Sequence, residues 1–198
     1  MTAAASSFPP LTVPPPERID LLGEVALVRC DPALAAPAVA AINDSLEHLS
    51  PWMAWATEPA TIAGMSTFFA ASAELWDQRR DFGYTVLDDA AGAVIGGAGL
   101  HNRLGPGGLE IGYWMHVAHT GRGLATQVAG ALTQAAFELD GIERVEIHCA
   151  EQNHRSARVP AKLGFTFRGL EVPEGGPCAG RSTQIWVVTE QEWRTRTS

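Results

Sequence analysis

Hydrophobic and polar residues alternate in several short segments of the chain, with the two-residue period of a β-strand. In the clearest segment Leu109, Ile111, Tyr113 and Met115 share one face, and Glu110 lies on the other. Further apolar or alternating segments predict strands at residues 24–30, 82–87, 93–100, 144–150, 165–172 and 183–189. The pattern therefore predicts a β-sheet at the centre of the fold.

Apolar residues recur every three or four positions in other segments, which is the period of an amphipathic helix. The clearest case is residues 122–139, where Leu124, Val128 and Leu132 fall on one stripe. Similar patterns predict helices at residues 32–43, 59–80 and 153–163, and Gly164 follows the last of them. This order of elements predicts an α+β fold with a mixed sheet that includes a strand–helix–strand unit.

The length and the distribution of proline set the expected domain organisation. A chain of 198 residues suits one domain better than two. Residues 1–16 hold five of the thirteen prolines, so we expect a flexible Pro-rich arm there and a single domain at 17–198. We find no signal-peptide pattern at the start and no later run of about 18 apolar residues. The expected protein is cytoplasmic and has no membrane partner.

Charge and composition exclude some kinds of partner. The net charge is −8 and the Lys and Arg residues are not concentrated, which argues against nucleic-acid binding. An acidic surface suits a cationic amine better. Cys30, Cys149 and Cys178 form no close pair, and the six histidines lack the spacing of metal ligands. We therefore expect neither a disulfide framework nor a bound metal.

The strongest chemical signal is the segment 110–126, a strand that runs through a glycine turn directly into a helix. Gly121 and Gly123 remove side chains from the turn, so successive backbone N–H groups can point at a phosphate on the positive end of the helix. No Gly-Lys-Ser/Thr follows, so the turn is not a Walker loop, and Thr126 replaces the third glycine of a dinucleotide fingerprint. A tight turn without a ligand is the alternative.

A second segment lies downstream, with Asn153-His-Arg-Ser156 leading to Lys162-Leu-Gly-Phe165. Together with Glu-Ile-Gly-Tyr-Trp at 110–114 and Gly-Arg-Gly-Leu-Ala-Thr at 121–126, it resembles the GNAT superfamily of acetyltransferases. The likeness is greatest to the Rim-type branch, which includes N-terminal acetyltransferases of ribosomal proteins, and spans about residues 18–194. It implies a mostly antiparallel sheet of six to seven strands, splayed at the fourth and fifth strands and flanked by helices.

The resemblance also implies where acetyl-CoA, the expected co-substrate, would bind. The glycine turn would hold the pyrophosphate, backbone groups of the preceding strand would pair with pantetheine, Asn153 would bind beside it, and Ser156 would stand near the thiolate. The implied cofactor-binding residues are Met115, His116, Val117, Thr120, Gly121, Arg122, Gly123, Leu124, Ala125, Thr126, Asn153 and Ser156.

Two positions depart from the family pattern, and two have another interpretation. Thr120 stands where the family usually has Gln or Arg, which removes one side-chain contact. Pro160 falls inside the predicted helix, where it removes an N–H and crowds the carbonyl of Ser156. From the residues alone, Asn153 and Ser156 could simply cap that helix.

Acyl transfer to an amine needs a neutral amine, a polarised carbonyl and a proton for the thiolate. An α-amine with a pKa of about 7.8 is far more often neutral at pH 7 than a lysine amine with a pKa of about 10.4. Glu110 is the first candidate base, because the missing side chain of Gly112 beside it leaves room for a ligand. The alternative is an ion pair with a residue such as Arg144. Glu174 is the second candidate, since the Rim-type branch places a catalytic glutamate in that loop.

We expect His48, Trp52 and Trp55, together with Glu110, to line the cleft for the acceptor amine, although the tryptophans could equally fill the core. The predicted function is transfer of an acetyl group to a primary amine, most simply the α-amine of a protein or peptide N-terminus. A small amine, an amino-acid derivative or an antibiotic is the alternative acceptor. A CoA-binding module without catalysis is a second alternative, and a homodimer is possible because similar proteins often dimerise.

Overall fold

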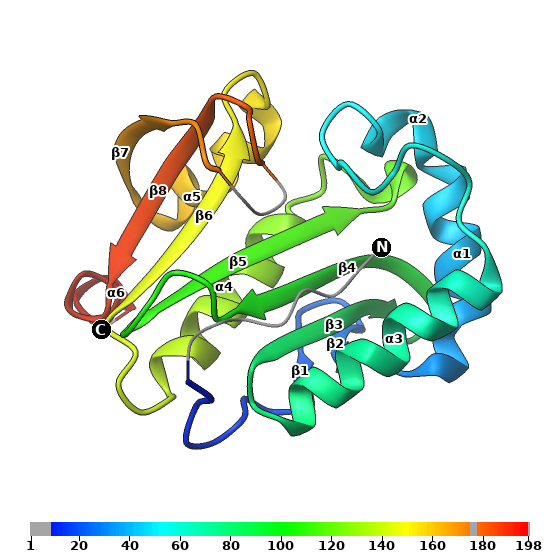
Figure 1. Ribbon diagram of the computed structural model, residues 1–198, viewed down its shortest axis with the longest axis horizontal. Coiled ribbons are helices and arrows are strands. Elements are labelled where there is room, and N and C mark those ends of the chain that lie inside the picture. Colours follow the sequence, from blue (N-terminus) through cyan, green and yellow to red (C-terminus); the bar gives the residue numbers. More distant parts are fainter. Residues whose placement is uncertain (1–8, 175–177, 198) are drawn as a thin grey trace.

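The computed structural model describes residues 9–174 and 178–197. Its eight strands form one sheet in the order β1-β2-β3-β4-β5-β6-β8-β7 (Figure 1). The strands are β1 (Arg18–Asp20), β2 (Val25–Arg29), β3 (Asp81–Asp88), β4 (Ala93–His101), β5 (Gly108–Met115), β6 (Arg144–Ala150), β7 (Thr166–Glu171) and β8 (Thr183–Thr189). The helices are α1 (Ala35–Asp44), α2 (Leu46–Leu49), α3 (Ile62–Asp77), α4 (Leu124–Phe137), α5 (His154–Leu163) and α6 (Glu190–Thr197), with short 3₁₀ turns η1 (Pro32–Leu34) and η2 (Val117–His119).

The predicted α+β class and the mixed, mostly antiparallel sheet are confirmed. All neighbouring strands are antiparallel except β5 and β6, which are parallel. The described residues hold eight strands where six to seven were predicted. The additional strand, β1, is only three residues long and pairs with β2, so its sequence is too short to show a period.

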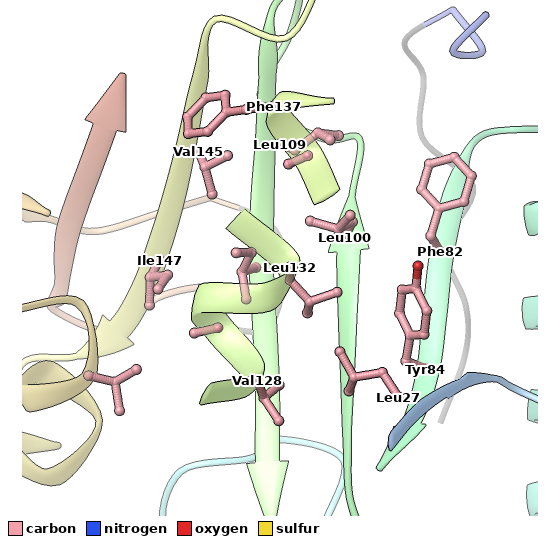
Figure 2. Packing of buried hydrophobic residues seen from close by; sticks show 14 of the residues in the cluster. Leu27, Phe82, Tyr84, Leu100, Leu109, Val128, Leu132, Phe137, Val145 and Ile147 are labelled. Carbon is pink, nitrogen blue, oxygen red and sulfur yellow. The ribbon is translucent and has the colours of Figure 1, made fainter. Parts of the chain in front are cut away.

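Helices cover both faces of the sheet. Figure 1 shows α1 and α3 over the near face, and α4 behind the sheet. The side chains of β5 alternate between the two faces of the sheet as predicted, since Leu109 and Ile111 belong to the main core with Leu132 of α4. Figure 2 shows Leu109 and Leu132 in this core. Burying each such side chain stabilises the fold by about 1.5–3 kcal/mol. Glu110 and Trp114 therefore lie on the near face.

Strands β5 and β6 pair over only four residues and then separate. The parallel register joins residues 108–111 to 144–147. Beyond this point β5 stays paired with β4 as far as Met115, and β6 stays paired with β8 as far as Ala150. The two strands form a V in Figure 1, which confirms the splay predicted between the fourth and fifth strands of the sequence. The open end of the V lies beside the turn before α4.

The described part of the proline-rich arm is fastened to the sheet. Leu11 donates a hydrogen bond to the Arg79 carbonyl, and the Tyr84 hydroxyl donates to the Pro16 carbonyl. The Asn102 side chain also donates to the Pro9 carbonyl. These bonds hold residues 9–16 against the rest of the fold, the flexible arm at 1–16 stays a prediction, and residues 1–8 lie outside the described residues. The single domain at 17–198 stays a prediction.

Candidate functional site

The glycine turn before α4 has the backbone conformation that its sequence predicts. Gly121 has φ +75° and Gly123 has φ +81°, in the left-handed region that favours glycine. A Cβ atom at either position would meet no atom within 4 Å among the described residues. The glycines are therefore required by the backbone and not by close packing, and they leave the surface over the helix N-terminus open.

The donors available at this turn are fewer than predicted. Thr126 and Gln127 both donate their N–H groups to the Gly123 carbonyl, at 3.0 and 3.1 Å. Thr126 therefore does not fit its predicted place among the pyrophosphate donors. The N–H groups at residues 122–125 come before these first intrahelical bonds, where the orphan donors of a helix point along its axis. These four donors remain suited to an anion.

The end of β5 presents backbone groups to the V. His116 donates its N–H to the Ile95 carbonyl of β4 at 2.8 Å. Because backbone groups alternate in direction along a strand, the Met115 N–H faces the opposite side, toward β6. This N–H group can donate a hydrogen bond to a ligand that lies between the two strands, as predicted for pantetheine.

Val117 does not fit its predicted pairing with pantetheine. Its N–H donates to the Ser45 hydroxyl at 3.0 Å, and its carbonyl accepts from the Thr120 hydroxyl at 3.0 Å. Ser45 is 1% exposed and joins α1 to α2. The His116 ring accepts from the Ala118 N–H at 3.1 Å. Ser45, His116 and Thr120 therefore shape the chain before the glycine turn, and sequence reasoning missed Ser45.

Asn153 and Ser156 meet at the start of α5, on the other arm of the V. Asn153 is the N-cap, and its Oδ1 accepts from the Ser156 N–H at 3.1 Å. This confirms the capping interpretation for Asn153 but not for Ser156, and it leaves the Asn153 Nδ2 group for a ligand. The Ser156 hydroxyl lies 3.0 Å from the Tyr113 hydroxyl of β5. Sequence reasoning missed Tyr113, whose side chain bridges the two arms.

Pro160 explains part of this bridge. The helix α5 starts at His154 and contains Pro160, as the sequence predicts. Proline lacks the N–H that would bond to the carbonyl four residues earlier, which belongs to Ser156. That carbonyl instead accepts from the Tyr113 hydroxyl at 3.3 Å. Burial raises the pKa of Tyr113, so this hydroxyl stays protonated and remains a donor.

We expect Tyr113→Phe to lower the free energy of unfolding by about 1–2 kcal/mol, because it leaves the Ser156 carbonyl without a donor. In a Pro160→Ala background the restored N–H can supply that bond, so the same change should cost less. Urea unfolding of the four variants measures the difference. Equal losses in both backgrounds would show that Tyr113 does not compensate for Pro160.

Glu110 lies on the near face and is paired with an arginine. Its two carboxylate oxygens accept from Arg103 Nε at 2.7 Å and from a second Arg103 nitrogen at 2.5 Å. Burial would raise the pKa of Glu110, but the Arg103 guanidinium outweighs it and holds the pKa below its usual range. The predicted alternative of an ion pair is thus present, with Arg103 in place of Arg144. The space beside Gly112 is taken by His101, whose Nε2 lies 3.1 Å from where a Cβ would stand.

His148 of β6 lies beside Glu110 and was missed by sequence reasoning. Its Nε2 is 2.7 Å from Glu146 Oε2, and its Nδ1 is 3.7 Å from Glu110 Oε2. Burial alone would lower the pKa of His148, but the bond to Glu146 and the charge of Glu110 raise it above its ordinary value. Glu146 is also held by Arg144 Nε at 3.0 Å.

Aromatic residues lie over the same face. Trp55 meets Trp114 of β5 edge to face, with ring centroids 6.2 Å apart, and Trp52 is half-buried. Burial and the nearby charge of Arg155 on α5 lower the pKa of the half-buried His48. His48 therefore lies near enough to α5 for the positive charge of Arg155 to act on its ring. Glu174 is exposed and follows β7. The lining of an acceptor cleft by these residues stays a prediction.

The fold and the site point to one family. Residues 27–166 match the family described as acetyltransferase (GNAT) domain. The chain belongs to the GNAT acetyltransferase family. Rim-type proteins are among the relatives and structural neighbours of this GNAT chain.

One curated relative and two solved structures illustrate these similarities. Ribosomal-protein-serine acetyltransferase of Escherichia coli strain K12 is 33% identical over 60 residues, which are 30% of this chain and 34% of that protein. The chain thus matches about a third of the length of the curated relatives. RimL, a ribosomal L7/L12 α-N-protein acetyltransferase solved with coenzyme A, has a TM-score of 0.77 at 17% identity, over 89% of this chain and 99% of that one. The microcin C7 self-immunity acetyltransferase MccE, solved with acetyl-CoA and AMP, has a TM-score of 0.78 at 20% identity, over 88% and 97%.

Other kinds of site find no support in the described residues. No cluster of three or more His, Cys, Asp or Glu side chains in residues 9–174 and 178–197 is arranged to hold a metal ion. Within the same ranges, no helix is both long and apolar enough to span a membrane. Burial raises the pKa of the Cys30 and Cys149 thiols to about 11, so both stay protonated at neutral pH.

Proposed function

We propose that this chain is an acetyl-CoA-dependent N-acetyltransferase that acts on the α-amine of a protein or peptide N-terminus. The observation that carries the proposal is the open glycine turn at the N-terminus of α4, beside the open end of the β5–β6 V. The names of the Escherichia coli relative and of RimL support an N-terminal acceptor. The net charge of −8 favours a cationic substrate.

The residues present fit coenzyme A at this place. The N–H groups of residues 122–125 would hold the pyrophosphate, with Gly121 keeping the approach open. The Met115 N–H and the Asn153 Nδ2 group would bind pantetheine from the two arms of the V. Thr120, His116 and Ser45 would hold the turn in place through the bonds described above.

The chemistry assigned to the site is direct transfer. The amine nitrogen attacks the thioester carbonyl carbon, and the carbon–sulfur bond then breaks. The Met115 N–H would stabilise the developing negative charge on the carbonyl oxygen. The Ser156 hydroxyl would give a proton to the departing sulfur, with the Tyr113 hydroxyl 3.0 Å behind it. Glu110 and Glu174 remain the bases proposed from sequence, although the lowered pKa of Glu110 makes it a weak one.

Two measurements test the proposal. Calorimetry with acetyl-CoA tests the cofactor site, and thiol release with a panel of peptides and small amines tests turnover. Mass spectrometry of a lysate given labelled acetyl-CoA then identifies the acceptor. Acetylated protein N-termini would support the proposal. Acetylation of small molecules alone would favour a small-molecule acceptor, and the likeness to the self-immunity acetyltransferase MccE is the observation behind this second candidate. Binding without thiol release would indicate a CoA-binding module.

A further inference from the structure

The hydrogen bonds around His148 fix which of its ring nitrogens can accept a proton. Glu146 is ionised and paired with Arg144, so it can only accept hydrogen bonds. The His148 Nε2 atom, 2.7 Å from Glu146, therefore carries the hydrogen in the neutral ring. The lone pair is then on Nδ1. In many enzymes that use histidine as a base, a hydrogen bond from one ring nitrogen to another group orients the imidazole, as Glu146 does here.

The Nδ1 atom of His148 is not engaged by Glu110. Their separation of 3.7 Å is longer than a hydrogen bond. Both oxygens of Glu110 are instead taken up by Arg103. The lone pair on Nδ1 is thus left on the side of β6 that faces Glu110 and β5.

The position of His148 on β6 puts it at the point where the strands part. It directly follows Ile147, the last residue of β6 that pairs with β5. Because side chains alternate along a strand, His148 shares the near face with Glu146, whose register partner is Glu110. Its side chain is 15% exposed, so part of the residue is open to solvent.

We propose that His148, oriented by Glu146, accepts the proton of the acceptor amine. This inference rests on the proposed acetyltransferase function. As the amine nitrogen bonds to the acetyl carbon, one N–H proton passes to His148 Nδ1, directly or through one water. The electron pair of the carbon–sulfur bond leaves with the sulfur, which takes a proton from Ser156. His148 then returns its proton by way of solvent, and Ser156 regains one, so that the net products are the amide and the thiol of coenzyme A.

The charges facing His148 determine its expected pH dependence. Glu146 from β6 and Glu110 from β5 favour the protonated ring, and Arg103 from the β4–β5 loop opposes it. His101 from β4 lowers the pKa of Glu110 through its charge, so it also belongs to the charged residues around His148. The resulting pKa is above its ordinary value, which is about 6.5. A base with such a pKa is well matched to an α-amine of pKa about 7.8.

The experiment compares kcat/KM from pH 5.5 to 9.5 for the full chain and its variants, with a peptide substrate identified by the panel and lysate screen proposed above. We expect the wild-type kcat/KM to rise with pH, and the midpoint of this rising limb to lie above the pKa of an ordinary histidine. His148→Gln should lose that limb and fall about 10²- to 10⁴-fold in kcat, while calorimetry shows unchanged acetyl-CoA affinity. His154→Gln, an exposed histidine on α5, is the matched control and should keep both rate and limb.

Two further measurements distinguish His148 from Glu110. Glu110→Gln should keep the limb and move it to lower pH, because a negative charge that raises the His148 pKa is removed. In the wild type, the NMR titration of the His148 ring should have the same midpoint as the rising limb of the kinetic profile. This measurement does not depend on the folding of any variant. If Glu110→Gln abolishes the limb while His148→Gln retains it, the proposed role of His148 is overturned. If the wild type binds acetyl-CoA but acetylates no amine, the proposed function itself fails.

Discussion

Arg103→Met is expected to lower the free energy of unfolding by about 3–5 kcal/mol. The change leaves the Glu110 carboxylate, whose side chain is 9% exposed, without the bidentate partner that now satisfies both oxygens. Removing one member of a buried ion pair costs this much because the remaining charge stays desolvated. Urea unfolding monitored by circular dichroism at pH 7 measures the loss.

The matched control is the double variant Arg103→Met with Glu110→Leu, which removes both charges and replaces the two side chains with apolar ones of similar size. It should recover most of the lost stability, since replacing a whole buried pair by hydrophobic residues is often neutral. Because the pKa of Glu110 is lowered in the folded wild type, the contribution of the pair is complete above the ordinary carboxylate pKa of about 4.3 and is lost as the pH falls further. The difference in free energy of unfolding between wild type and Arg103→Met should therefore be smaller at about pH 3 than at pH 7. A double variant as unstable as the single one would contradict this account.

The sequence was informative wherever local pattern and local conformation decide the structure. Alternation along 109–115 predicted which side chains face α4, because successive side chains of a strand point to opposite faces of the sheet. Positive φ at Gly121 and Gly123 follows from the same local reasoning, since few other residues adopt that conformation. The three-residue strand β1 has no such signal and forms only by pairing with β2.

Residues of the site that depend on pairing between distant segments could not be predicted in the same way. Ser45 reaches the Val117 N–H across 72 positions, and nothing near Ser45 in sequence marks it. His148 meets Glu110 only through the parallel register of β5 and β6, which no short-range pattern fixes. Arg103 is different, because the β4–β5 hairpin pairs His101 with Glu110, and a register worked out for this hairpin would have placed Arg103 close by.

Gly123→Ala is expected to weaken acetyl-CoA binding about 10- to 100-fold. At φ +81° the added methyl group strains the backbone at the N-cap of α4 and stands on the surface that we assign to the pyrophosphate. Losing one or more charge-assisted hydrogen bonds from this turn, each contributing about 1.5–3 kcal/mol, accounts for that range. Isothermal titration calorimetry with acetyl-CoA measures the change in Kd.

Gly141→Ala separates backbone strain from loss of the ligand site. Gly141 has φ +77° and, like Gly123, has no atom within 4 Å of an added Cβ among the described residues. It lies in the turn between α4 and β6, at the opposite end of the helix from the glycine turn. Both variants should therefore lose a similar amount of stability, about 1–2 kcal/mol, while only Gly123→Ala loses affinity. If the two variants bind acetyl-CoA equally well, the pyrophosphate does not lie on the turn at residues 121–125, and the cofactor site must be sought elsewhere along the V.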